Sequence, residues 1–121
     1  MPHYSAIVQE HFHQPRNVGP LEGATHQGTA GAPGDGPYAV IWLRIEGGRI
    51  AEAAYRTHGC PAAMASCSMV AELATGKTVD QALGLRPEEL MEALGGLPEG
   101  KEHCPVLAVE ALRNAIGGGE R

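Results

Sequence analysis

The residues of this chain best suited to chemistry are its three cysteines, Cys60, Cys67 and Cys104. Cys60 and Cys104 share a local design, because a proline follows each of them directly and opens a predicted helix. We therefore expect both thiols at helix N-caps, where free backbone N–H groups and the helix dipole favour thiolate over thiol. Both sulfurs should then be better nucleophiles and better metal ligands than ordinary cysteines.

Two further side chains could join these thiols. His103 directly precedes Cys104 and offers an imidazole ligand or a proton donor, and Asp35 lies between two glycines in a loop. If the helices that begin at Cys60 and Cys104 pack side by side, the four groups could converge as mixed O, S and N ligands for zinc or for an iron–sulfur cluster. Spacing alone does not show convergence, and a Cys-Pro at a helix start is more often structural, so the residues by themselves leave a metal site open.

The third cysteine and the other histidines are weaker candidates. Cys67 follows Cys60 by two helical turns, roughly 10 Å, which is too far to ligate the same ion, so we expect it to pack in the core. His58 could reach the site as an outer hydrogen-bond donor. His11 and His13 point to different faces of a helix and do not form a ligand pair.

The first half of the chain predicts a short helix, a loop region and a hairpin. Tyr4, Ile7, Val8 and Phe12 recur at helical spacing, and the helix should end near Gln14 because a proline follows. Residues 19–36 are rich in Gly and Pro, allow one short edge strand around 26–29 and predict a mobile loop at 31–36. Residues 38–45 and 50–57 predict two strands joined by a tight turn.

The second half predicts helices over residues 61–75, 78–83, 87–94 and 105–116. A capping box at Thr78 starts the second of these, and Ala108, Val109, Leu112 and Ile116 form the buried stripe of the last. The fold class is α+β, with helices packed on one face of a small antiparallel sheet of about three strands. We expect one domain over 1–121, with the N-terminal helix and flexible loop region in 1–36.

Composition narrows the classes of partner. The chain has 121 residues, nine Lys and Arg and a formal net charge of −5, which excludes electrostatic attraction to nucleic acid. An odd number of cysteines argues for thiol or metal chemistry rather than a disulfide framework. No secretory signal opens the sequence and no apolar run approaches the length of a membrane span, so we expect a soluble, cytoplasmic protein without membrane contact.

Four motifs in order resemble those of the IscU/NifU N-terminal-type iron–sulfur scaffold family. Residues 14–19, Gln-Pro-Arg-Asn-Val-Gly, are similar to the family's Asn-Pro-Arg-Asn-Val-Gly. Residues 31–33, Gly-Ala-Pro, resemble the lead into its first ligand loop. Residues 57–66 resemble its second cysteine segment, and residues 101–104, Lys-Glu-His-Cys, resemble its third.

The resemblance implies a scaffold or carrier rather than an enzyme. A cysteine desulfurase would supply sulfur, iron would join it in a labile [2Fe-2S] cluster, and acceptor proteins would take the cluster. Cys60 and Cys104 match the second and third ligand cysteines, His103 matches the ligand-site histidine, and Cys104 is the candidate sulfur acceptor. The family's first cysteine falls on Asp35; a gap could instead align Asp35 with the family's nearby aspartate, and either way one thiolate is missing.

These departures open alternatives. Because carboxylate is a harder ligand than thiolate, the set Asp35, Cys60, His103 and Cys104 should hold iron–sulfur clusters less tightly and accept Zn²⁺ readily. A zinc-stabilised, protein-binding regulatory module is therefore the second interpretation, and a thiol-redox protein without a Cys-x-x-Cys pair is the third. Residues 97–101 resemble the Leu-Pro-Pro-Val-Lys segment recognised by an Hsp70 chaperone, but Glu-Gly replaces Pro-Val, which argues against the usual recognition.

Overall fold

The computed structural model describes residues 4–14, 17–31 and 38–117. Asp35 and nearly all of the predicted mobile loop lie outside these residues. The helices and strands, in chain order, are α1 (Ala6–His13), β1 (His26–Gly31), β2 (Tyr38–Glu46), β3 (Arg49–His58), α2 (Pro61–Ala74), α3 (Val79–Leu83), α4 (Pro87–Ala93) and α5 (His103–Gly117). The predicted elements are all present, and the α+β class is confirmed.

The three strands form one antiparallel sheet in the order β1-β2-β3. The turn between β2 and β3 consists of Gly47 and Gly48, which both have positive φ, at 60° and 77°. Glycine adopts this conformation without a steric penalty, and two such residues match the twist of a hairpin. The predicted hairpin is confirmed, and the predicted edge strand is β1.

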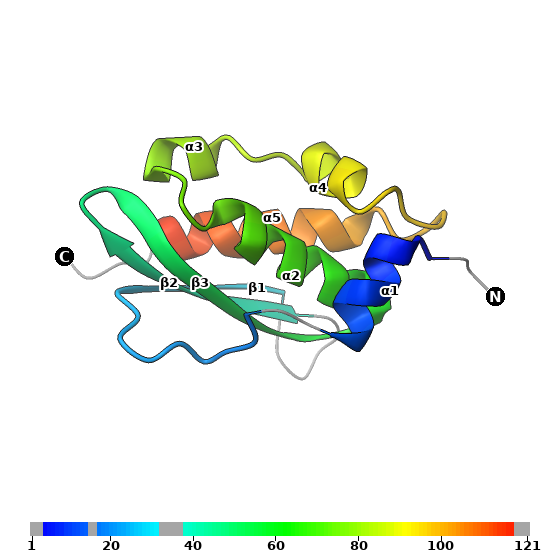
Figure 1. Cartoon of the computed structure of the whole chain (residues 1–121), viewed down its shortest axis with the longest axis horizontal. Helices are drawn as coiled ribbons and strands as arrows, with labels where there is room; N and C mark the ends of the chain where they lie inside the picture. The colour runs from blue at the N-terminus through cyan, green and yellow to red at the C-terminus, as the bar shows by residue number, and fades with distance from the viewer. Residues whose placement is uncertain (1–3, 15–16, 32–37, 118–121) are drawn as a thin grey trace.

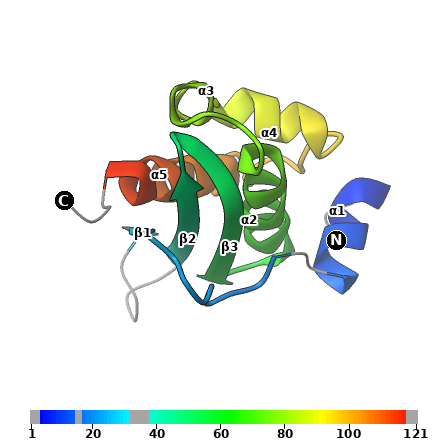
Figure 2. The same ribbon diagram turned by 60° about the vertical axis from the view of Figure 1, so that its left-hand side comes forward.

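Helices α2 and α5 cover one face of the sheet, while α3 and α4 lie beyond them (Figures 1 and 2). Strand β2 alternates as a half-buried strand should, with Ala39, Ile41 and Leu43 fully buried toward the helices. Ten of the 14 residues of α2 are buried, because this helix is covered by the sheet, α5 and α1. The expected one-sided packing is confirmed.

Helix α1 docks on α2 by a face that differs in part from the one predicted. Val8 and His11 are buried, whereas Ile7 and Phe12 keep 39% and 38% of their surface exposed. The His11 ring Nδ1 lies 2.7 Å from the Ser68 hydroxyl of α2, and this hydrogen bond is available only if the histidine turns inward. The apolar spacing located the helix and the burial of Val8 correctly but was wrong about Ile7 and Phe12.

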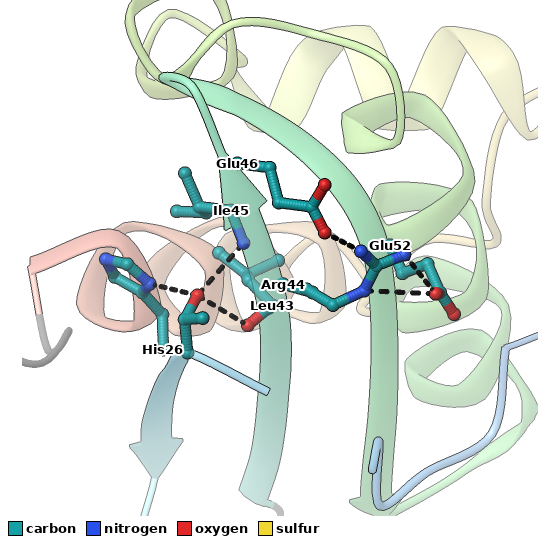
Figure 3. Close-up of polar contacts among 7 residues, drawn as sticks. His26, Leu43, Arg44, Ile45, Glu46 and Glu52 are labelled. Atoms are coloured by element: carbon teal, nitrogen blue, oxygen red, sulfur yellow. Dashed lines mark hydrogen bonds and ion pairs between the residues drawn. The ribbon is translucent and has the colours of Figure 1, made fainter. Parts of the chain in front are cut away.

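The open face of the sheet is partly polar (Figure 3). Arg44 of β2 forms ion pairs with Glu52 of β3 and with Glu46 of its own strand. At the entry to β1, the Thr25 hydroxyl accepts a hydrogen bond from the Ile45 N–H at 2.9 Å and lies 2.7 Å from His26 Nδ1. The hydrogen bond between Ile45 and Thr25 fixes the start of the edge strand β1 on the sheet.

The helix termini follow their local signals closely. Thr78 and Gln81 form the predicted capping box of α3. Helix α5 begins at His103, two residues earlier than the predicted start at Pro105, which changes the position of Cys104. Within the described ranges, no helix combines the length and the apolar character needed to cross a membrane.

Gly28 of β1 sets the distance between the sheet and α5. A Cβ atom at this position would lie 2.0 Å from the backbone nitrogen of Ala115 and 2.4 Å from the backbone carbon of Asn114.

Backbone cannot yield as a flexible side chain can, so Gly28→Ala should lower the free energy of unfolding by about 2 kcal/mol or more. Urea denaturation measures this change. Gly117→Ala at the open end of α5 is the control, with an expected change within about 0.5 kcal/mol; equal effects of the two variants would contradict the close approach.

Candidate functional site

Two thiols meet where α2 and α5 begin. Cys60 is the N-cap of α2, with the extended backbone angles φ −80° and ψ 174°, and Pro61 opens the helix behind it. Cys104 is the second residue of α5. Because α2 and α5 pack together on the sheet, the two sulfur atoms lie 3.9 Å apart although 44 residues separate them in the chain. The structure therefore brings together the pair that spacing alone could not place.

His103 completes a second pair, since its Nε2 lies 3.6 Å from the Cys104 sulfur. Ligands on one tetrahedral zinc ion are separated by about 3.8 Å for two sulfurs and about 3.6 Å for sulfur and nitrogen. Each pair thus has the spacing of two ligands on a shared ion. The three side chains taken together, however, do not form a group that could hold one metal ion. No such group of three or more exists elsewhere among the described His, Cys, Asp and Glu residues.

The two thiols ionise differently. Burial opposes ionisation of Cys60, but hydrogen bonds from the backbone N–H groups of Ala63 and Ala62, a hydrogen bond from Cys104 and the charge of Lys101 outweigh it, so its pKa is lowered. Cys104 is 2% exposed. Burial first, and then the negative charge of its neighbour Cys60, raise the pKa of Cys104 to about 12. Cys60 is consequently the thiol that ionises first.

This result corrects one sequence-based prediction. Cys104 was expected at an N-cap with a stabilised thiolate, but α5 starts at His103, so Cys104 lies inside the first turn. It is buried beside Ala62 and Ala63, with Leu97 and Tyr4 packed around this small cluster. The predicted N-cap position and stabilised thiolate of Cys104 are therefore wrong, whereas both are confirmed for Cys60.

Of the remaining candidates, Cys67 packs in the main core, His58 contacts Tyr38, and Asp35 lies outside the described residues. Cys67 is 1% exposed within the main core, and burial raises the pKa of its thiol to about 12. Its predicted packing role is confirmed. His58 is exposed and stacks on Tyr38 across the hairpin, with ring centroids 6.1 Å apart. Asp35 falls outside the described residues, so its approach to the thiols stays a prediction.

Lys101 affects the ionisation of the two thiols, a role that the sequence did not predict. Its positive charge is one of the causes that lower the pKa of Cys60, and at Cys104 it opposes, without overcoming, the rise in pKa caused by burial and by the charge of Cys60. The sequence signal for this role is the position of Lys101 three residues before Cys104, in the Lys-Glu-His-Cys motif. The segment 97–101 connects α4 to α5, and its first residue, Leu97, packs against both apolar clusters.

The arrangement suits soft metals and sulfur transfer. A partly exposed, readily ionised thiol stands beside a buried one, with a lysine nearby and an imidazole at the rim. Thiolates and imidazole are ligands for zinc, copper and iron–sulfur centres. The apolar side chains of Ala62, Ala63 and Leu97 limit access of water to the sulfur of Cys104.

Comparison with known proteins gives the class and then the family. Two solved structures share the fold: a putative iron–sulfur cluster assembly scaffold protein for the SUF system from Fervidobacterium islandicum AW-1 (TM-score 0.73, 18% identity, 93% of this chain and 96% of that chain) and the N-terminal part of a NifU-like protein from Brucella abortus (TM-score 0.70, 19% identity, 93% and 91%). They define the class as small α+β domains of the scaffold fold.

Two relatives found by sequence have a higher identity to this chain than the two solved structures have. The iron–sulfur cluster assembly scaffold protein IscU 1 of Archaeoglobus fulgidus is 46% identical over 113 residues, which cover 93% of this chain and 74% of that protein. The IscU scaffold protein of Aquifex aeolicus is 41% identical over 115 residues, or 93% and 73%. The NifU-like N terminal domain model matches residues 3–118. The chain belongs to this family, as its four motifs indicated.

The ionisation order of the thiols can be tested by alkylation. In metal-free protein at neutral pH, iodoacetamide should modify Cys60 before Cys104 or Cys67, because a lower pKa leaves more thiolate to react. Lys101→Met should raise the pKa of Cys60 and slow its alkylation. Mass spectrometry of peptides over time measures both effects.

Lys77→Met is the matched control, because Lys77 follows the far end of α2, roughly 20 Å of helix from Cys60. Modification of Cys104 first, or equal rates in the two lysine variants, would contradict the assignment.

Proposed function

We propose that the chain is an iron–sulfur cluster assembly scaffold that holds a labile [2Fe-2S] cluster as cargo and passes it to acceptor proteins. The observation that carries this proposal is the 3.9 Å separation of Cys60 and Cys104, in a chain of the NifU-like N-terminal family. The relatives from Archaeoglobus fulgidus and Aquifex aeolicus are named as scaffolds of this kind. A paired thiolate site is what an iron centre requires.

In this proposal Cys60, Cys104, His103 and Asp35 are the cluster ligands. Cys60 supplies the thiolate that ionises first and can capture iron. Cys104, sheltered by apolar side chains and 3.6 Å from His103, loses its proton when a metal or a persulfide donor engages the site. Asp35 supplies the oxygen ligand in place of the family's first cysteine.

The proposed partners follow from this role. A cysteine desulfurase delivers sulfur, with Cys104 as the accepting residue, and acceptor proteins remove the finished cluster. The chain acts as a carrier rather than as an enzyme, and we place it in the cytoplasm. Recognition of residues 97–101 by an Hsp70 chaperone is not part of the proposal, because Leu97 is held in the packing around Cys104.

Anaerobic reconstitution tests the scaffold function. Incubation of the apo protein with ferric iron and sulfide should produce the visible absorption of an oxidised [2Fe-2S] cluster. Cys60→Ser and Cys104→Ser should each abolish it, because each removes one of the two paired thiolates. A desulfurase, cysteine and a thiol reductant that converts the delivered sulfur to sulfide should give the same spectrum.

Cys67→Ala is the matched control, since Cys67 is buried away from the pair and alanine still fills most of its space. This variant should fold and keep the spectrum. A colourless wild-type protein, or a Cys104→Ser variant that assembles as much cluster as wild type, would overturn the proposal.

A zinc-binding module is the second candidate, favoured by one observation. Taken pair by pair, the sulfur–sulfur and sulfur–imidazole separations of 3.9 and 3.6 Å suit two ligands of a tetrahedral ion, and a rearrangement that brings His103 and a carboxylate to the thiol pair would complete a set that zinc accepts. In that case the metal would stabilise the fold, and the protein would regulate the assembly machinery through contacts with its components.

Metal analysis separates the two candidates. For a scaffold, protein purified without oxygen should contain iron or exchange its zinc readily when iron and sulfide are supplied. Zinc at one equivalent per chain that resists this exchange would favour the zinc module. In that case, zinc removal should also lower the thermal midpoint of wild type more than that of Cys60→Ser.

A further inference from the structure

A groove of about 640 Å³ lies between α4 and the start of α5. Figure 1 shows the two helices next to each other at this end of the molecule. The lining comes from one face of α4, the two glycines that follow it, and the first turn of α5 with the residue before it. The lining residues are Pro87, Glu88, Met91, Glu92, Gly95, Gly96, Glu102 and Val106.

The floor of the groove is apolar and open. Val106 of α5 keeps 46% of its surface exposed, which is unusual for a valine in the first turns of a packed helix. Met91 faces it from α4 and offers a flexible apolar surface that adapts to a partner. A Cβ atom at Gly96 would meet nothing within 4 Å, so the groove stays open at this glycine.

The rim of the groove is acidic. Glu88 and Glu92 lie one helical turn apart on α4, and Glu102 stands opposite, before α5. No Lys or Arg belongs to the lining, and none of these three carboxylates forms an ion pair with any residue in the described part of the chain. Glu102 instead accepts a hydrogen bond from the Gly100 N–H at 3.0 Å, which holds its carboxylate in place. A basic ligand would find three carboxylates there that form no ion pair with the described residues.

We propose that this groove is the docking site for a basic amphipathic helix of a partner protein. A groove between two helices accepts the apolar face of a third, whose large side chain would enter between Met91 and Val106. Lys or Arg residues on either side of that face would pair with Glu88, Glu92 and Glu102. A second copy of this chain is a poor occupant, because its own net charge is −5.

The groove lies near the thiol pair, and this position indicates what a bound partner helix would do. Glu102 lies two residues before Cys104 in the chain, so a helix bound to the groove stands near the thiol pair. The contact would hold a sulfur donor or a cluster acceptor next to the site. The binding itself does not require the thiols.

The experiment uses a fluorescent synthetic helix built of Leu on one face and Lys on the others, titrated with the full chain and followed by anisotropy. We expect saturable binding that weakens as salt is added. The double charge reversal Glu88→Lys/Glu92→Lys and the single change Val106→Glu should each weaken binding about tenfold or more. Amide shifts in NMR spectra should concentrate on residues of α4 and the start of α5.

The matched controls separate docking from general attraction between opposite charges. Glu22→Lys changes an exposed carboxylate of the segment before β1, and Leu83→Glu changes an exposed leucine of α3. Neither should alter the affinity. A peptide of the same pattern with Glu in place of Lys should not bind, and Cys104→Ser should bind as wild type does, whatever the outcome of cluster reconstitution.

Three results would overturn the proposal. Equal weakening by the groove variants and by the controls would mean nonspecific charge attraction, and retained affinity in Val106→Glu would mean that the apolar floor is not used. No saturable binding of the basic helix would reject the groove as its site.

Discussion

The packing of α2 against α5 on one face of the sheet is the constraint on which the site depends. Cysteine and proline stand at the N-cap and first position of α2 and within the first turn of α5, and the packing of the two helices brings the sulfurs of Cys60 and Cys104 to 3.9 Å. The close approach of α5 to β1 at Gly28 fixes the height of α5 over the sheet. A shift of either helix by one residue, 1.5 Å along its axis and about a quarter turn around it, would separate the thiols.

The two thiols are chemically unequal because their positions relative to the helix start differ by two residues. Cys60 lies outside α2 and receives its free N–H groups, whereas Cys104 lies inside α5 among alanines. The pKa of the first is lowered and that of the second is raised. A site with one ionised and one protected sulfur can begin to bind a metal through one ligand and complete the binding through the other.

Much of the fold could be predicted from local signals. The glycine pair of the hairpin, the capping box at Thr78 and the proline at the start of α2 each placed an element correctly. Two predictions failed for a physical reason. His11 rather than Phe12 is buried, because a hydrogen bond between α1 and Ser68 of α2 outweighs the apolar spacing. Helix α5 begins two residues before the proline that was predicted to open it. The first depends on a contact between segments that are distant in the chain.

By itself, the sequence determined the family, the order of the elements, and the residue types of the candidate site, because motifs, caps and turns are encoded within a few neighbouring residues. Only the tertiary structure decided that Cys60 and Cys104 meet, that Cys67 does not join them, and that Lys101 acts on both thiols. It also revealed the acidic groove beside them. Distance, burial and charge environment arise from the packing of segments far apart in the chain, and local patterns carry no record of that packing.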